Sequence, residues 1–179
     1  MVGPTWTCPR NARAALVVRG EVFLKAGAED RNNTAAGNLC MALRLHLHLH
    51  LRGSAWRVYA RDIKLRVEAA DCYFYPDVMV TCSATDQANP LIKSEPKLII
   101  EVLSPSAAAY DRGLKFGYYR ALPTLQEYLL VDLDTRITDC YRKGADGLWV
   151  LHPFGKGEAV KLASVDLEIS AVALYAEVV

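Results

Sequence analysis

The sequence predicts a mixed α/β (α+β) fold, and three features of the chain lead to this class. Segments with the period of strands and segments with the period of helices follow one another in an irregular order, unlike a regular βαβ array. The 179 residues are enough to bury a sizeable core. Neither a long linker nor a domain-sized repeat interrupts them. We therefore expect a single domain that spans residues 1–179.

The composition is typical of a soluble globular protein. Hydrophobic residues make up 52% of the chain, charged residues 23%, and the formal net charge is +1. This balance gives no support to a strongly basic nucleic-acid binder, although a local basic groove is compatible with it. No apolar run approaches the length of a membrane span, and the N-terminus lacks the apolar core of a secretion signal.

The cysteines favour reduced thiols in a cytoplasm over a disulfide framework. They are five in number, scattered along the chain, and none forms a CxxC pair. We expect most of them to act as small buried hydrophobic side chains. They are Cys8, Cys40, Cys72, Cys82 and Cys140.

The first third of the chain predicts two short strands followed by a helix. Residues 15–27 read as two strands that turn at Gly20, with Glu21 just after the turn. The segment that follows begins as a helix, for which Asn33 or Thr34 could supply the N-terminal cap. A glycine ends it at position 53.

A leucine–histidine repeat at residues 43–52 permits two interpretations. Its alternation has the period of a strand, which would place His46, His48 and His50 on one face, where they could bind zinc. In a helix only the first and last of these histidines are neighbours. The tract is also compatible with a low-complexity expansion of an amphipathic helix. We favour the helix because the flanking cap and glycine signals agree with it.

The rest of the chain predicts strands around one further helix. A polar loop crosses residues 86–95, and the helix over residues 112–122 is ended by a proline at 123. A short helix closes the chain over residues 169–178. The expected strands are residues 56–60, 63–68, 72–82, 97–103, 125–132, 136–143, 147–153 and 159–164.

One glutamate interrupts an otherwise apolar strand. Glu101 lies between Ile100 and Val102, and an ionised carboxylate there is costly unless it is paired or binds a metal. By strand alternation Glu101 and Asp77 could share a face if their two strands are neighbours. Two like charges in one place call for a cation, and oxygen ligands alone suit Mg²⁺ or Mn²⁺ better than zinc.

Other charged residues could complete such a site or explain it away. Glu21 is a third candidate acid, and Lys115 follows in the helix after the Glu101 strand, four residues after Asp111. Alternatively, Asp77 caps a turn and a nearby lysine or arginine merely neutralises Glu101. Candidates for phosphate contacts are Arg57, Arg61, Arg112 and Arg120.

Several blocks occur in the order found in one nuclease family. They are "YPDVMVTC", "PKLIIEVLSPS", "YDRGLKFGYYRAL" and "LQEYLLVD", preceded by "GEVFLKAG" and "AAGNLCMAL". Together they resemble the Uma-type restriction endonucleases, a branch of the PD-(D/E)XK nuclease superfamily. The resemblance runs from about Gly20 to the C-terminus. It implies a restriction-endonuclease-like core, in which helices flank a mixed central β-sheet.

The resemblance also implies roles for individual residues. Asp77 and Glu101 match the acids that bind the metal, and the carbonyl oxygen of Val102 would complete the oxygen shell. The superfamily lysine lies two residues after the second acid, where this chain has Leu103. Lys115 matches the helix position from which this branch supplies the lysine instead. Glu21 matches an early acid of the family.

The implied activity is metal-assisted hydrolysis of phosphodiester bonds in nucleic acid, with DNA as the expected substrate and Mg²⁺ or Mn²⁺ as cofactor. A homodimer is compatible with the resemblance. The chain departs from the family pattern in residues 1–19, in the expanded leucine–histidine repeat, and at Asn32, where the family often has histidine. These departures, with Leu103, motivate an alternative: a nuclease fold that binds nucleic acid or protein without turnover.

Overall fold

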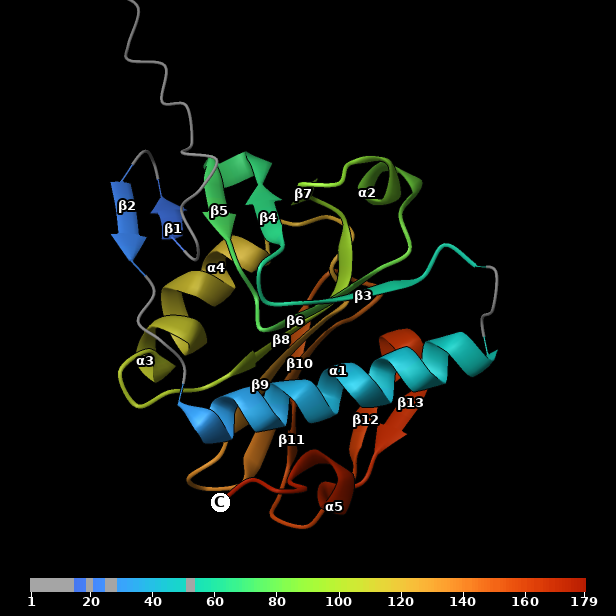
Figure 1. The fold of residues 1–179 in the computed structure, drawn as a ribbon. Coiled ribbons are helices and arrows are strands. Elements are labelled where there is room, and N and C mark those ends of the chain that lie inside the picture. Colours follow the sequence, from blue (N-terminus) through green and yellow to red (C-terminus); the bar gives the residue numbers. More distant parts are fainter. Residues whose placement is uncertain (1–14, 19–20, 25–28, 51–53) are drawn as a thin grey trace, which may run out of the picture.

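The computed structural model describes the backbone of residues 15–18, 21–24, 29–50 and 54–179, and the side chains of residues 29–49 and 54–179. Within these ranges the expected fold class is confirmed, because a mixed sheet is flanked by helices (Figure 1). The helices are α1 (Asp30–His50), α2 (Ala84–Ala88), α3 (Ala108–Tyr110), α4 (Phe116–Tyr119) and α5 (Ala171–Leu174).

The central sheet has six strands in the order β11-β10-β9-β8-β6-β3. Its pairs are antiparallel except β8 with β9, which are parallel. A parallel pair needs a crossover between its strands, and here the crossover is the segment from α3 to α4. The strands are β3 (Arg57–Ala60), β6 (Val78–Thr81), β8 (Pro96–Val102), β9 (Glu127–Asp132), β10 (Ile137–Lys143) and β11 (Trp149–Phe154).

Two smaller sheets accompany the central one. The first has the order β2-β1-β5-β4-β7, and the second pairs β12 with β13. Figure 1 shows the first above α1, at the top of the view, and the second below the helix, near α5. Their strands are β1 (Ala15–Val18), β2 (Glu21–Leu24), β4 (Lys64–Val67), β5 (Cys72–Phe74), β7 (Ile92–Lys93), β12 (Val160–Leu162) and β13 (Leu167–Ile169).

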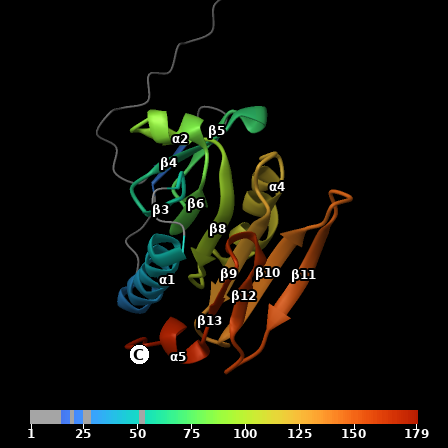
Figure 2. The same ribbon diagram turned by 90° about the vertical axis from the view of Figure 1, so that its right-hand side faces the viewer.

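Strand β8 is buried on both faces, and this separates the core into two layers. Leu98, Ile100 and Val102 pack in the layer that contains α1, whereas Ile99 and Leu103 pack in the layer under α3 and α4. Figure 2 shows the two helical segments on opposite sides of β8. A central strand covered on both faces is expected to be almost wholly apolar, so the single acid in β8 stands out.

Several sequence expectations need correction in detail. Helix α1 begins at Asp30, before the expected caps. The expected strand over residues 72–82 is two strands in different sheets, because Pro76 separates β5 from β6 and cannot donate to a ladder. The expected loop over residues 86–95 contains most of α2 and the short strand β7. Near the C-terminus β13 was not expected, and α5 is shorter than the helix expected over residues 169–178.

The leucine–histidine repeat is helical over residues 43–50, as favoured from the sequence. These residues form the C-terminal part of α1, and Leu43 and Leu47 among them are buried. The Nε2 atom of His46 lies 2.9 Å from the carbonyl oxygen of Val165, so this histidine has a structural partner. No group of three or more metal-binding side chains occurs among the described residues, and the side chain of His50 lies outside them.

Neither a membrane-spanning helix nor a disulfide is found among the described residues. No helix within the described ranges is long and apolar enough to cross a membrane. The four cysteines that the structure describes form no disulfide, and three of them are buried, as expected for small apolar side chains. Cys8 lies outside the described residues.

Candidate active site

Asp77 and Glu101 lie opposite each other on adjacent strands. Strands β6 and β8 are antiparallel, with Val78 opposite Ile100. Asp77, which precedes Val78, therefore lies opposite Glu101, which follows Ile100. Both acids belong to the face of the sheet that α3 and α4 cover, as strand alternation predicted. Their exposed fractions are 6% for Asp77 and 2% for Glu101. Two buried carboxylates on facing strands repel each other, so the arrangement requires positive charge nearby.

Lys115 supplies positive charge at Glu101. Its Nζ lies 2.8 Å from Glu101 Oε1 and 2.9 Å from Asp111 Oδ1. Burial lowers the pKa of Lys115, but the two carboxylates outweigh burial and raise the pKa above its ordinary value. Lys115 is therefore a cation at neutral pH. Leu103, at the usual lysine position, is instead an apolar residue of the core layer under α3 and α4.

Tyr119 is a second partner of Glu101. Its hydroxyl donates to Glu101 Oε1 over 2.9 Å, and the ring is fully buried. Burial and the adjacent Glu101 raise the pKa of Tyr119 well above its ordinary value, so the hydroxyl keeps its proton and remains a donor. Sequence reasoning missed this contact; the only available signal was that Tyr119 lies one helical turn after Lys115.

A π-helical turn, Asp111–Lys115, brings Asp111 and Lys115 into the site. The turn lies between α3 and α4 and was expected to be plain α-helix. Both residues are buried, with exposed fractions of 5% and 9%. The wider π turn alters the direction of side chains relative to an α-helix, and such turns are frequent at functional sites.

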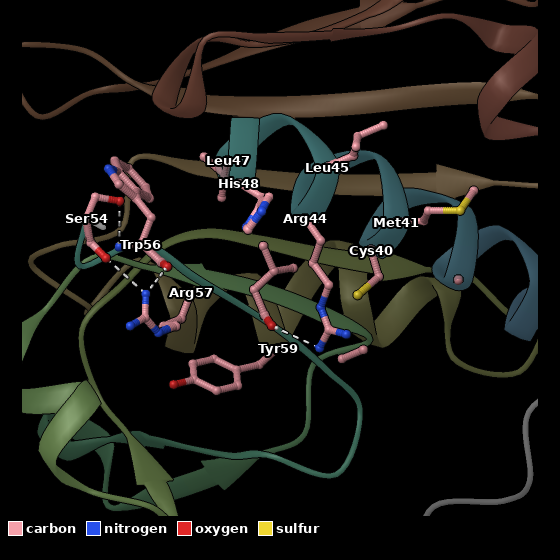
Figure 3. A pocket seen from close by; sticks show the side chains of 13 residues that line it. Cys40, Met41, Arg44, Leu45, Leu47, His48, Ser54, Trp56, Arg57 and Tyr59 are labelled. Carbon is pink, nitrogen blue, oxygen red and sulfur yellow. Dashed lines mark hydrogen bonds between the residues drawn. The ribbon is translucent and has the colours of Figure 1, made fainter. Parts of the chain in front are cut away.

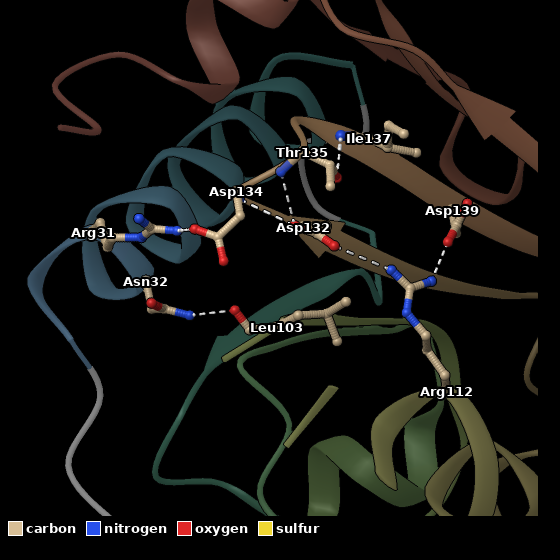
Figure 4. Close-up of polar contacts among 9 residues, drawn as sticks. All are labelled: Arg31, Asn32, Leu103, Arg112, Asp132, Asp134, Thr135, Ile137 and Asp139. Atoms are coloured by element: carbon tan, nitrogen blue, oxygen red, sulfur yellow. Dashed lines mark hydrogen bonds and ion pairs between the residues drawn. The ribbon is translucent and has the colours of Figure 1, made fainter. Parts of the chain in front are cut away.

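Two contacts tie the π turn to the neighbouring strands. The hydroxyl of Tyr128 in β9 donates to the carbonyl oxygen of Asp111 over 3.1 Å. The guanidinium of Arg112 lies between Asp132 and Asp139 and donates to both carboxylates (Figure 4). Burial lowers the pKa of Arg112, but the hydrogen bond and charge of Asp139 outweigh it and raise the pKa. Arg112 therefore holds the π turn against β9 and β10. It does not face the carboxylate site, as a phosphate contact would.

The backbone of Val102 joins both sides of the site. Its N–H donates to Asp77 Oδ2 over 2.9 Å, which fixes that carboxylate at the end of β8. Its carbonyl oxygen accepts from Asn32 Nδ2 over 3.3 Å, and the same amide donates to the Leu103 carbonyl oxygen over 2.8 Å (Figure 4). A carbonyl oxygen has two lone pairs, so the Val102 oxygen keeps one for a further partner. Asn32, which the sequence showed only as a departure from the family, thus supports the site.

Arg61 contacts both Asp77 and the backbone of Asn32. Its Nε lies 4.0 Å from Asp77 Oδ1, and its backbone N–H donates to the Asp77 carbonyl oxygen over 3.0 Å. Its Nη2 donates to the backbone carbonyl oxygen of Asn32 over 3.2 Å. The backbone of Arg61 is left-handed, with φ of 48°, a conformation that costs energy in a non-glycine residue and is common near functional sites.

Of the four arginines proposed as phosphate contacts, Arg61 is the one that adjoins the carboxylates. Arg57 donates to the carbonyl oxygens of Ser54 and Trp56. Arg120 lies over the ring of Phe116, 5.2 Å from its centroid. The side chain of Arg61 is 28% exposed, so it can meet a ligand that arrives from solvent.

The donor set fits a hard divalent cation. Asp77 and Glu101 offer carboxylate oxygens, and the Val102 carbonyl oxygen lies next to them along β8. Mg²⁺ is commonly held by one or two carboxylates, with water and substrate oxygens completing its shell. Glu21 opens β2, the edge strand of the first smaller sheet, and its side chain lies outside the described residues.

The chain is similar to known proteins along most of its length. A family model, "Uma2: Putative restriction endonuclease", matches residues 6–173. "Uncharacterized protein sll1609" of Synechocystis sp. is 37% identical over 137 residues, which cover 75% of each chain. "Uncharacterized protein slr1290" of the same organism is 36% identical over 156 residues, which cover 87% of this chain and 80% of the relative.

One solved structure has the same fold. It is the crystal structure of a putative nuclease belonging to DUF820 from Anabaena variabilis, which matches with a TM-score of 0.76. The match covers 96% of this chain and 95% of that chain. The sequences are 15% identical, so the likeness concerns the fold alone.

Proposed function

The chain belongs to the Uma2 family, and from this premise we propose that it is an endonuclease that uses a divalent metal ion to hydrolyse phosphodiester bonds of DNA. One observation carries the proposal: Asp77 and Glu101 face each other across β6 and β8, with the Nζ of Lys115 2.8 Å from Glu101. Two carboxylates that could share a metal ion, with a lysine beside one of them, suit metal-assisted hydrolysis of a phosphodiester.

The metal would be held by Asp77, Glu101 and the carbonyl oxygen of Val102. A Mg²⁺ or Mn²⁺ ion there would supply Lewis-acid polarisation of the scissile phosphate and would lower the pKa of water. The N–H of Val102 keeps Asp77 in place, and the hydroxyl of Tyr119 orients Glu101. Both carboxylates are therefore directed before any ligand arrives, which reduces the reorganisation that binding requires.

Lys115 would act at the attacking water and at the phosphate. In the metal-free protein the carboxylates of Glu101 and Asp111 raise its pKa above the ordinary value, which favours the ammonium form. As an ammonium group it can orient the attacking water and stabilise negative charge that develops on the phosphate. Arg61, partly exposed beside Asp77, would contact the same phosphate from the other side of the carboxylate pair.

Glu21 would contribute to the metal environment, directly or through water, as the family resemblance implies. A single substitution tests this without any change to the two central acids. If Glu21 takes part, Glu21→Gln lowers the cleavage rate and weakens metal binding. If cleavage and metal binding by Glu21→Gln equal those of the wild type, the residue has no part in the site.

A substrate panel tests the proposed activity. Wild-type protein is incubated with plasmid DNA, single-stranded DNA and RNA, each with Mg²⁺, with Mn²⁺ or with a chelator. The proposal expects cleavage of DNA that the chelator abolishes. No cleavage of any substrate with either metal would contradict it.

Calorimetry separates an active site from a nuclease fold that only binds. Titration with Mn²⁺ should show binding to the wild type that Asp77→Asn abolishes. Glu168→Gln is a matched control, since that carboxylate is 57% exposed and pairs with Lys161 away from the site. Nucleic-acid or protein binding that needs neither the metal nor Asp77 would favour the non-catalytic alternative.

A further inference from the structure

Helix α1 has a second apolar stripe that faces solvent. Met41, Leu45 and Leu49 are 66%, 59% and 66% exposed, whereas Leu43 and Leu47 are buried. The alternation of the repeat explains this arrangement. Residues two positions apart are about 200° apart around a helix, so alternating leucines must appear on opposite faces. A helix with apolar residues on both faces is normally covered on both, so the outer stripe indicates a surface for a partner.

Met41 and Leu45 of the stripe line a groove between α1 and the edge strand β3 (Figure 3). The groove has a volume of about 960 Å³. Cys40, Leu47 and Val58 lie buried at its base. Met41 and Leu45 are on the helix wall, and the remaining lining includes Trp56 and Tyr59. The surface is thus concave and largely apolar, as binding grooves usually are.

The charge around the groove has one sign. Arg44, His48 and Arg57 line it, and none of the described lining residues is acidic. The chain as a whole has 21 basic and 20 acidic residues, so this asymmetry is a local property. Basic side chains around an apolar groove favour an occupant that combines apolar side chains with acidic ones.

The edge of β3 is already closed to an added strand. Arg44 Nη2 donates to the carbonyl oxygen of Val58 over 3.3 Å, so a partner that paired with β3 would have to displace this arginine. Side-chain docking requires no such displacement. The groove therefore favours a helix laid against α1 over a strand added to the sheet.

We propose that the groove between α1 and β3 binds an acidic amphipathic helix of a protein partner. Apolar side chains of that helix would cover Met41 and Leu45, and its carboxylates would face Arg44 and Arg57. The surface is distinct from the carboxylate site, since Val58 belongs to the α1 core layer and Glu101 faces the opposite layer. The proposal is independent of the nuclease activity.

A display library of helical peptides provides the probe. In each peptide the leucines are spaced so that they lie on one face of a helix. Each of the remaining positions is either glutamate or lysine. Selection uses the full-length wild type with counter-selection on Leu45→Glu, which places a charge in the apolar wall. Leu45 is 59% exposed, so this variant should fold, and circular dichroism checks it. The matched control is Leu148→Glu. Leu148 is the residue before β11, is 65% exposed and does not line the groove.

The proposal expects selected peptides to be rich in glutamate. Their affinity should fall by about tenfold or more with Leu45→Glu, be unchanged with Leu148→Glu, and weaken as salt increases. It should also fall with Arg57→Glu, and binding should change the tryptophan fluorescence of the wild type but not of Trp56→Phe. Selected peptides without an excess of glutamate, or no groove-dependent peptide at all, overturn the proposal.

Two other occupants give distinct results. Self-association of the wild type in sedimentation velocity, lost in Leu45→Glu but retained in Leu148→Glu, would show that a second copy covers the stripe. An unlabelled DNA oligonucleotide that changes the tryptophan fluorescence of the wild type, but of neither Trp56→Phe nor Arg57→Glu, would show that the groove binds nucleic acid. Either result replaces the acidic helix as the occupant and overturns the proposal.

Discussion

The Nζ of Lys115 lies 2.8 Å from Glu101 Oε1, so the lysine reaches the acid from the crossover between β8 and β9 and not from the acid's own strand. The topology explains how this is achieved. The crossover passes over the face of β8 on which Glu101 lies, and its π turn orients Lys115 toward that face. Because the lysine comes from the crossover, position 103 can hold a leucine that packs in the core.

Removal of the Lys115 charge should separate metal binding from cleavage. We expect Lys115→Met to lower the rate of DNA cleavage by roughly 10²- to 10³-fold, since a positioned charge that stabilises the transition state is lost. Binding of Mn²⁺ should persist in calorimetry, because Asp77 and Glu101 remain. The variant should also be less stable by about 3–5 kcal/mol in urea unfolding without metal, since Glu101 is left buried without its cation. Wild-type cleavage by Lys115→Met would show that the lysine has no catalytic part.

Arg61 should contribute to the reaction more than any other candidate arginine. Its guanidinium lies 4.0 Å from Asp77 Oδ1 and is partly exposed, whereas Arg120 is held against a phenylalanine ring. We expect Arg61→Ala to lower kcat/KM by between about ten- and a hundredfold, with partial recovery in Arg61→Lys. Arg120→Ala is the control and should cleave at the wild-type rate. Equal effects of the two alanine variants would contradict the assignment.

Arg112 should act on the reaction through the position of Lys115. It holds the π turn against Asp132 and Asp139 and does not touch the carboxylate pair. We expect Arg112→Ala to lower kcat with little change in KM, because the lysine is displaced while the substrate contacts remain. Arg112→Lys should restore part of the rate, since it can still pair with one of the two acids. A change confined to KM would indicate a direct phosphate contact instead.

Glu127 should make the stability of the protein depend on pH. Burial raises the pKa of its carboxyl group, but hydrogen bonds from Ser164 and Arg142 outweigh burial and lower it below the ordinary value of 4.5. Since the folded pKa lies below the unfolded one, the stabilisation is present above about pH 4.5 and is lost as the pH falls through the folded pKa.

Urea unfolding of the wild type and of Glu127→Gln between about pH 7 and about pH 3 measures this contribution. We expect the variant to be less stable near neutral pH and to lose less stability on acidification. The amide cannot accept equally well from the backbone N–H groups of Ala163 and Ser164 and from Arg142. Parallel stability curves for the two proteins would mean that Glu127 does not carry the acid dependence.

The central geometry could be predicted because it depends on local rules. Strand alternation places Asp77 and Glu101 on one face once β6 and β8 are neighbours, and a spacing of four residues relates Lys115 to Asp111. The contacts of Asn32 and Arg61 could not be predicted, because they join residues far apart in the chain through tertiary packing. Neither could the π turn, since its hydrogen-bond pattern has no distinct signature in the sequence.

The leucine–histidine repeat shows the limit of periodicity as evidence. A period of two is a strand signal, yet residues 43–50 are helical because the helix has one complete buried stripe that packs on the sheet. The second set of leucines is what creates the strand-like alternation, and it is exposed in this chain. The alternation of leucine and histidine is compatible with a helix when the exposed leucines form the proposed binding surface.

The most direct test of the account is the cleavage of linear duplex DNA by the wild type and by Glu101→Gln, with Mn²⁺ present. Glutamine has nearly the shape of glutamate and can still accept from Tyr119, but it lacks the charge that binds the metal and pairs with Lys115. The account predicts cleavage by the wild type and none above background by the variant, with both proteins folded. Full cleavage by Glu101→Gln would contradict it.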